Sequence, residues 1–384
     1  MKNNMFSFGE DKNDKKDNII KLSFLSFLSS PKKMSFIAVA LICLLTGCEK
    51  PLPEDDSQFH AAADASPRLL LLNEGAWGNN NASLTLIDNS GGMLDNNWFD
   101  AANGRGMGDV AQDVIIYGSK AYATVTFSNS LEVIDTASGR STRVDLGDRT
   151  PRYLAAMDGK LFITCYRPHS VVRLDTATLA VEAMCILGAY NPEGIAAMGG
   201  RLFVASSYVQ TNNSSYRRDS LLYVVDPQAM HVDTTLIVGL NPQQVVDIDG
   251  RHLAVNYSGD YTDGTSGTAI VDATTLNVCQ MGLTLTGMCA AGGMLYGFDR
   301  RGYSQESTAT YYKVNPSTLA THTIHLSPHT NTPYGMGIDP RNSDIYIFTD
   351  GNYTATGDIL CYGADGTLRW RANAGMLPRK LVVL

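Results

Sequence analysis

The sequence has little charge and lacks the common catalytic motifs. Only 18% of its 384 residues are Asp, Glu, Lys or Arg. It contains no Gly-x-Ser-x-Gly nucleophile elbow, no glycine-rich phosphate loop and no His-Glu-x-x-His zinc motif. A Cys-x-x-Cys-His haem signature and cysteine spacing for zinc are also missing. We therefore expect a protein that is not an enzyme and that uses no cofactor or metal.

An excess of positive charge is missing as well. The formal net charge is −8, and residues 1–47 alone hold seven Lys and four acidic residues, so the rest of the chain is more acidic still. Because a nucleic-acid partner requires a basic face that neutralises phosphates, the composition argues against such a partner.

Strong helical periodicity is absent after residue 66, and a strand-like repeat takes its place. Clear copies are Pro-Arg-Tyr-Leu-Ala-Ala-Met-Asp-Gly-Lys-Leu-Phe at 151–162 and Pro-Glu-Gly-Ile-Ala-Ala-Met-Gly-Gly-Arg-Leu-Phe at 192–203. Related segments start at 111, 151, 192, 242, 285, 333 and 378, which are 40–50 residues apart. This period, filled by short strands, predicts a β-propeller.

The second half of each repeat fits four strands, which we call a to d. Residues 130–135, 170–175, 221–226 and 268–272 each end a β-branched run with Asp, and Asn315 takes the same place in the next repeat. A short turn follows each time. Asp and Asn suit this place because their side chains can bond the backbone of the turn.

The two ends of the repeat region predict how the ring closes. Residues 378–384 match strand a, whereas residues 68–72 match strand b with no strand a before them. The C-terminal strand is therefore expected to complete the N-terminal blade. This predicts an all-β fold with six whole blades and one shared blade, seven in all. A pair of β-sandwiches or an open solenoid is the alternative.

The N-terminal segment is typical of a lipoprotein leader. Lys32 and Lys33 precede a short apolar run, which ends in Leu45, Thr46, Gly47 and Cys48. These four residues resemble the bacterial lipobox, which implies that Cys48 becomes the lipidated first residue of the mature protein. An ordinary secretory signal is the alternative. We assign 1–47 to the leader, 48–66 to a flexible tether and 67–384 to the propeller.

The start of the tether is acidic, with Glu49, Glu54, Asp55 and Asp56 close after Cys48. This pattern resembles the surface-export signal of Bacteroidetes lipoproteins. The resemblance implies a lipid-anchored outer-membrane protein exposed at the cell surface, with a periplasm-facing orientation as the alternative.

Five cysteines remain after those of the leader and the lipid site: Cys165, Cys185, Cys279, Cys289 and Cys361. Their number is odd and they lie in apolar strands, so we expect small buried hydrophobic residues. One disulfide in an oxidising compartment stays open as an alternative, and the sequence cannot pair them.

One face of the ring is expected to carry the function. In a propeller the b–c loops and the starts of the a strands open on the same side, which we call the channel-mouth face. Here the b–c loops are rich in Tyr, Asn and Ser, whereas the turns of the opposite face are short. The residues four past the strand-b aromatic position form an expected ring of Glu74, Thr126, Tyr166, Ser207, Tyr257, Arg300 and Asp350.

These loops suit a polar ligand with flat apolar faces, because aromatic rings give rigid contact area and amides give hydrogen bonds. We expect Tyr166 and Tyr257 to be anchors. Long aromatic loops without any ligand are the alternative. The predicted ligand-binding residues are Glu74, Trp77, Phe127, Arg152, Tyr153, Tyr166, Arg167, Tyr208, Gln243, Tyr257, Asp260, Tyr261, Arg300, Tyr303, Tyr334, Asp350 and Tyr353.

Two weaker metal patterns occur. His322, His325 and His329 lie close together in the sequence, and Asp260 and Asp263 flank a Gly-rich turn. The aspartate spacing is not that of a standard calcium loop. A plain turn and scattered histidines are the simpler interpretation, so we predict no metal site.

The repeat phrase, the strands ending in Asp and the Asn73 to Asp88 opening resemble YncE-like seven-bladed propeller lipoproteins of Bacteroidetes. The resemblance covers about residues 67–384. One branch, the BtuG-type surface lipoproteins, captures cobalamin and caps the outer-membrane vitamin B12 transporter. The resemblance thus implies capture of cobalamin or a related corrinoid and its transfer to a TonB-dependent transporter. No cobalamin-specific residue can be carried over.

Two rival functions remain at this point. A protein-interaction propeller at the cell envelope would grip another protein with the same face. A propeller enzyme, such as a lyase or a quinoprotein-like oxidoreductase, would need convergent titratable groups, for which only Glu74, Asp113, Glu193, Arg300 and Asp350 are available.

Overall fold

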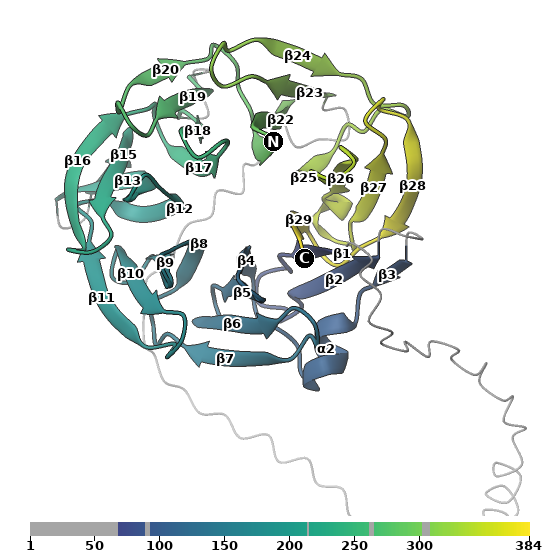
Figure 1. Ribbon diagram of the computed structural model, residues 1–384, viewed down its shortest axis with the longest axis horizontal. Coiled ribbons are helices and arrows are strands. Elements are labelled where there is room, and N and C mark those ends of the chain that lie inside the picture. Colours follow the sequence, from purple (N-terminus) through teal and green to yellow (C-terminus); the bar gives the residue numbers. More distant parts are fainter. Residues whose placement is uncertain (1–67, 89–92, 213–214, 261–264, 302–307) are drawn as a thin grey trace, which may run out of the picture. The chain divides into compact units, whose positions relative to one another are not determined.

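The computed structural model describes residues 68–88, 93–212, 215–260, 265–301 and 308–384. The predicted leader (1–47), Cys48 and the tether (48–66) lie outside these residues, as do Tyr261, Asp263 and Tyr303. Over the described part the chain forms seven antiparallel sheets arranged as the blades of a propeller (Figure 1). The predicted all-β, seven-bladed fold is confirmed.

Each blade runs from an inner strand beside the central axis to an outer strand at the rim (Figure 1). Blades 1 to 3 are β29–β1–β2–β3 (Pro378–Val383, Arg68–Asn73, Ser83–Asp88, Met93–Asp95), β4–β5–β6–β7 (Ala111–Tyr117, Lys120–Val125, Ser130–Asp135, Ser141–Asp145) and β8–β9–β10–β11 (Pro151–Met157, Lys160–Cys165, Ser170–Asp175, Val181–Ile186). Blade 4 is β12–β13–β15–β16 (Tyr190–Met198, Arg201–Asn212, Leu221–Asp226, His231–Ile237), with β14 (Ser215–Arg218) paired to the end of β13.

The remaining blades have the plain four-stranded form. Blades 5 to 7 are β17–β18–β19–β20 (Pro242–Asp247, His252–Tyr257, Gly267–Asp272, Val278–Gln280), β21–β22–β23–β24 (Gly287–Ala291, Met294–Arg301, Thr308–Val314, Thr321–Ile324) and β25–β26–β27–β28 (Pro333–Ile338, Ile345–Thr349, Asp358–Tyr362, Leu368–Asn373).

The ring closes through the chain's last strand. β29 pairs antiparallel with β1, with Leu69 opposite Val383 and Leu71 opposite Leu381. The observed inner strands begin within two residues of the predicted repeat starts, at 111, 151, 190, 242, 287, 333 and 378. The C-terminal strand therefore completes the N-terminal blade, as predicted.

The core is divided among the junctions of the blades. Seven apolar clusters each join residues of two neighbouring blades, and together they run round the ring. Middle strands are thus covered on both faces, which is why they are continuous apolar runs such as Leu69 to Leu72, all 0% exposed. The outer strands β11 and β16 are mostly exposed.

The turns after strand c take the predicted form. The side chains of Asp135, Asp175, Asp226, Asp272 and Asn315 each accept a hydrogen bond from the backbone N–H three residues later, at 2.7–3.0 Å. At Asp272 the bond from Thr275 N–H, together with Arg251, lowers the pKa of the carboxyl to about 2. The repeated Asp is therefore a structural turn residue.

Two local features differ from the sequence expectation. A six-residue helix, α2 (Trp98–Asn103), lies between β3 and β4 with Trp98 and Phe99 buried, and it is too short to produce a periodic signal. Cys279 is exposed and Cys289 is half-buried, although Cys165, Cys185 and Cys361 are buried as expected. None of the five cysteines forms a disulfide. Within the described part, no helix is long and apolar enough to cross a membrane.

Candidate functional site

The channel-mouth face is held together by the backbone of its loops. Residues just after strand b bond residues just before strand a of the same blade: Thr126 N–H donates to Val110 O at 2.8 Å, Tyr166 N–H to Thr150 O at 3.1 Å and Ser258 N–H to Asn241 O at 3.0 Å. The b–c loops and the starts of the inner strands therefore lie at one end of the ring, as expected.

Polar side chains meet at the axis on this face. Arg379 of β29 donates to Glu74 Oε2 at 2.9 Å and, with its other terminal nitrogen, to Tyr153 Oη at 2.9 Å. The Tyr334 hydroxyl donates to the same Glu74 oxygen at 2.5 Å. Since Arg379 and Tyr153 belong to blades 1 and 3, which are not neighbours, this contact spans part of the central opening.

The cluster continues toward blade 4. Arg152 donates to Gln112 Oε1 and, at 3.2 Å, to Glu193 Oε2. Its guanidinium lies 4.7 Å from the centroid of the Tyr166 ring. The other oxygen of Glu193 accepts hydrogen bonds from the Tyr166 hydroxyl at 2.6 Å and from Ser207 at 3.2 Å. We call these nine residues the axial network: Glu74, Gln112, Arg152, Tyr153, Tyr166, Glu193, Ser207, Tyr334 and Arg379.

Protonation states in the axial network are fixed by burial and charge. Burial, with the carboxylates of Glu193 and Glu74 close by, raises the pKa of Tyr166 and of Tyr334 well above the ordinary value. Burial opposes the charge on Arg379, but Tyr153 and Glu74 outweigh it and raise its pKa. The phenols thus stay protonated as donors, and each carboxylate is already paired with an arginine. This arrangement is suited to holding the face rigid.

A third ion pair between arginine and a carboxylate on this face joins blades 6 and 7. Arg300 and Asp350 are 2.8 Å apart, with side chains only 3% and 4% exposed. Arg300 also donates to Pro333 O at 3.2 Å. Both predicted residues are present on this face, but their charged groups are directed at each other and at the backbone.

Other predicted residues remain accessible. Trp77 is 71% exposed and Phe127 is 47% exposed, and their rings lie edge to face with centroids 6.2 Å apart. Tyr353 is 43% exposed and packs edge to face on Tyr334 at 5.9 Å. Together with Tyr216, which is 46% exposed, these are the exposed large aromatic side chains of the described segments, and all belong to b–c connections.

Tyr257 requires a correction, because it does not join the ring at the channel mouth. Its hydroxyl donates to Gln280 of the outer strand β20 at 2.8 Å. The side chain fills space left by Gly239 and Gly267, where an added Cβ would lie 2.5 Å from the Tyr257 ring and 2.2 Å from its hydroxyl oxygen. Tyr257 thus packs toward the rim, between blades 4 and 5.

The remaining predicted residues lie over blades 3 to 5. Tyr208, on the extended part of β13, carries Arg218 over its ring at 5.6 Å. Arg218 also donates to Asp260 O at 3.5 Å, so the β13–β14 hairpin reaches blade 5. Gln243 donates to Asn241 Oδ1 at 2.6 Å. Arg167 is exposed.

The sequence prediction missed a stack of three rings beside Arg167. The centroids of His169 and Tyr190 are 3.8 Å apart with their ring planes tilted by 47°, and those of Tyr190 and Tyr216 are 4.2 Å apart with a tilt of 41°. These residues come from the b–c loop of blade 3, the start of β12 and β14. The three residues follow no fixed spacing in the sequence, so a pattern search does not connect them. The only sequence signal for this group is that each residue is an aromatic side chain in a loop or strand end of blade 3 or blade 4.

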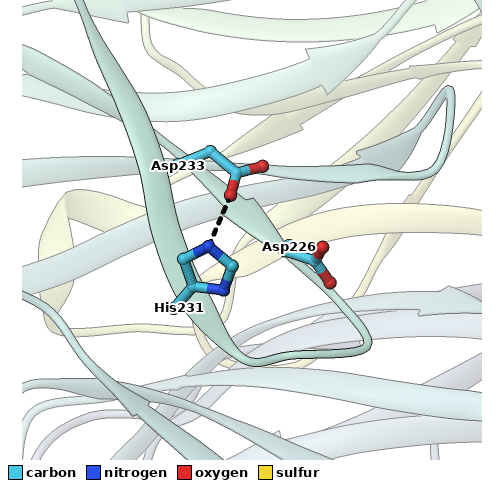
Figure 2. A group of neighbouring side chains, drawn as sticks. All are labelled: Asp226, His231 and Asp233. Carbon is cyan, nitrogen blue, oxygen red and sulfur yellow. Dashed lines mark ion pairs between the residues drawn. The ribbon is translucent and has the colours of Figure 1, made fainter.

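Of the two metal patterns considered from sequence, the aspartate pair includes Asp263, which lies outside the described residues, and the histidines are described here. His329 bonds Ala309 O at 2.9 Å and packs on Tyr311, apart from His322, which lies in β24. Among described residues, the group whose ligand atoms approach one another is Asp226, His231 and Asp233, all within 4.8 Å (Figure 2). It lies on the exposed c–d turn of blade 4, away from the channel-mouth face. The Asp226 carboxylate there accepts a hydrogen bond from Ala229 N–H in the turn, and His231 pairs with Asp233 at 2.9 Å.

Comparisons with known proteins show the fold alone. No protein-family model and no curated protein matches the chain. Solved propellers do match: a putative 6-phosphogluconolactonase from Bacteroides fragilis has a TM-score of 0.59 at 12% identity, covering 83% of this chain and 98% of that one. A quinonprotein alcohol dehydrogenase-like protein from Bacteroides thetaiotaomicron has a TM-score of 0.56 at 13% identity, and the match covers 81% of this chain and 77% of that one. AztD from Citrobacter koseri has a TM-score of 0.52 at 13% identity, and the match covers 82% of this chain and 83% of that one.

Proposed function

We propose that this propeller captures a small ligand on its channel-mouth face and is not an enzyme. The observation that carries the proposal is the asymmetry of exposed aromatic residues, since those of the described segments all lie on b–c connections. Trp77 and Phe127 contact each other in the open, and a contiguous exposed apolar patch commonly marks a binding site. Below them, the axial network gives the face a rigid polar floor.

The ligand we favour is cobalamin or a related corrinoid. Cobalamin is large, fringed with amides and has a broad apolar face, so Trp77 and Phe127 could cover the flat part while loop amides meet the fringe. Contacts such as Arg379 with Tyr153 cross the opening, so a large ligand would rest on the face rather than enter the ring. The resemblance to cobalamin-binding surface lipoproteins is the reason for choosing this ligand over others.

The location and the partner follow from the same resemblance. Lipidation at Cys48 would tether the propeller to the outer membrane, with the channel-mouth face free to receive ligand at the cell surface. Release to a TonB-dependent transporter would complete the role. The absence of a role in catalysis is supported by Glu74 and Glu193, whose carboxylates are ion-paired instead of poised as bases.

Calorimetric titration of the full chain, purified in detergent, with cyanocobalamin tests the proposal. We expect saturable one-to-one binding that Trp77→Ala weakens. Ile237→Ala is the matched control, because Ile237 is equally exposed, at 74%, but lies on the outer strand β16. No heat of binding at micromolar protein would remove cobalamin as the ligand.

A protein partner is the second candidate, and it rests on the same exposed Trp77. Tryptophan is enriched among the residues that dominate protein interfaces. A photo-crosslinker at position 77 in intact cells would separate the two cases. Attachment to one envelope protein in a chain that ignores cyanocobalamin would favour the protein-interaction role.

A further inference from the structure

We propose that the channel-mouth face carries, over blades 3 and 4, a site for a planar ring that bears a phosphate or carboxylate group. This inference rests on the proposed function, since it assumes that the face binds a small ligand, but it does not require that ligand to be cobalamin. The site comprises the stacked rings of His169, Tyr190 and Tyr216 and the guanidinium groups of Arg149 and Arg167.

The aromatic part of the site is a ladder that opens to solvent. His169 and Tyr190 are half-buried, whereas Tyr216 at the other end of the stack is 46% exposed. Tyr216 belongs to β14, whose pairing with β13 holds it above the blade. An added planar ring could pack on the exposed Tyr216, because aromatic rings attract one another in offset and edge-to-face arrangements.

The cationic part of the site adjoins the ladder. Arg167 lies two residues before His169, and burial together with the charge of Arg167 lowers the pKa of His169. Burial and Tyr216 raise the pKa of Tyr190, and the charge of Arg167 opposes that rise. The backbone N–H of Arg167 donates to the backbone carbonyl of Arg149 at 3.0 Å, so the two residues are neighbours in the fold. Arg167 is the arginine at the end of the ring group, and the Arg149 guanidinium next to it bonds Leu146 O.

These two arginines have no carboxylate partner in the described part of the chain, unlike most others. Ten arginines form ion pairs, including Arg152, Arg300 and Arg379 of the same face. Arg167 is exposed and its side chain makes no ion pair there, while Arg149 uses one nitrogen on Leu146 O at 2.6 Å. The Nε of Arg149 is buried with no partner among the described atoms.

Nearby carboxylates do not cancel this charge. Glu193 is paired with Arg152, and Asp219 is 2% exposed and accepts hydrogen bonds from Tyr223 and Ser220. Asp148, next to Arg149 in sequence, is exposed and forms no ion pair within the described segments. In a chain of net charge −8, two arginines without acidic partners favour an anion.

The imidazole of His169 adds a donor to the site. Asn191 N–H donates to His169 Nδ1 at 3.4 Å, so the ring proton lies on Nε2 in the neutral form. Guanidinium groups bind phosphate or carboxylate through paired N–H donors, and they also stack on aromatic faces. Rings, arginines and an imidazole N–H together suit a planar anionic group better than a neutral sugar or an aliphatic chain.

Flavin mononucleotide and riboflavin are suitable probes, because they share one planar ring and differ by a phosphate. We expect the full chain to bind flavin mononucleotide at least about tenfold more tightly in calorimetry, the effect of one hydrogen bond to a charged group. Excess inorganic phosphate should compete with flavin mononucleotide and leave riboflavin binding unchanged. Equal affinity for the two probes, or binding of neither, would overturn the proposal.

Three variants refine the test. Arg167→Ala should remove most of the preference for the phosphate form, and Arg167→Lys should restore part of it. Tyr216→Ala should weaken both probes alike. Arg140→Ala, an exposed arginine on the opposite side of blade 2, is the control and should change nothing. A preference that survives Arg167→Ala would contradict the assignment.

The outcomes separate this inference from the proposed function. Binding of flavin mononucleotide that depends on Arg167, without binding of cyanocobalamin, would support the anion site and remove cobalamin. Binding of cyanocobalamin with equal affinity for both flavins would do the reverse.

Discussion

At the residue scale, the channel-mouth face contains two kinds of aromatic side chain. The hydroxyl groups of Tyr166 and Tyr334 donate to glutamate side chains, and that of Tyr153 accepts from Arg379. Trp77 and Phe127 contact each other and otherwise face solvent. The first kind builds the platform, and the second kind is available to a ligand.

Replacing Trp77 and Tyr257 should therefore have opposite effects. Trp77→Ala should weaken cyanocobalamin binding by about 1–3 kcal/mol with little change in stability, because the side chain is mostly exposed. Tyr257→Ala should leave binding unchanged and lower the free energy of unfolding by about 2 kcal/mol, because it empties the space between Gly239 and Gly267. Calorimetry and urea denaturation of both variants would measure the two effects. A loss of affinity in Tyr257→Ala alone would contradict this division.

His169 should titrate below the ordinary histidine. Burial and the charge of Arg167 lower its pKa, and it packs on Tyr190. The unfolded chain then binds a proton more readily than the folded chain. Stability from this group is present above the unfolded pKa of about 6.5 and falls as pH drops through that value toward the folded pKa. An NMR titration of the imidazole would measure this shift, and a pKa above 6.5 in the folded protein would refute it.

At the scale of elements, β29 is the strand on which the ring depends. It covers the edge of β1, and its Arg379 and Lys380 bond residues of blades 1, 2 and 3. Deleting residues 378–384 should leave the edge of β1 unpaired and produce aggregation instead of a folded monomer. Lys380→Ala is the control, because it removes one ion pair with the buried Asp113 but keeps the strand and the hydrogen bond from Leu154 N–H to Asp113, so it should elute as the parent does in size-exclusion chromatography. A monodisperse deletion variant would contradict the closure role.

Repeated local signals explain why the elements could be predicted. Buried middle strands require apolar runs and the turns after strand c require Asp or Asn, so each signal recurs once per blade. The site was less predictable because partners depend on neighbouring blades. Counting four residues past the strand-b aromatic position selects both Tyr166 and Tyr257, yet Tyr257 pairs with Pro242 as Cys165 pairs with Pro151, so Ser258 is the residue equivalent to Tyr166. Because a shift of one residue directs a side chain to the other face of a strand, Tyr166 bonds Glu193 at the axis whereas Tyr257 bonds Gln280 of an outer strand.

For the propeller as a whole, one face is specialised. Exposed aromatic rings, Arg167 and the β13–β14 hairpin lie on the channel-mouth face, whereas the opposite turns are short and carry aspartates bonded to their own backbone. Seven similar apolar junctions hold the ring, so loops on one face can change without disturbing the core. Ligand binding is therefore expected to leave the blades in place.

Hydrogen–deuterium exchange of the full chain with and without cyanocobalamin tests the central claim most directly. The account predicts slower exchange in the b–c loops at 74–82, 126–129 and 350–357, with no change in the c–d turns at 136–140 and 227–230. Slower exchange confined to those c–d turns, or none anywhere at saturating ligand, would contradict capture on the channel-mouth face.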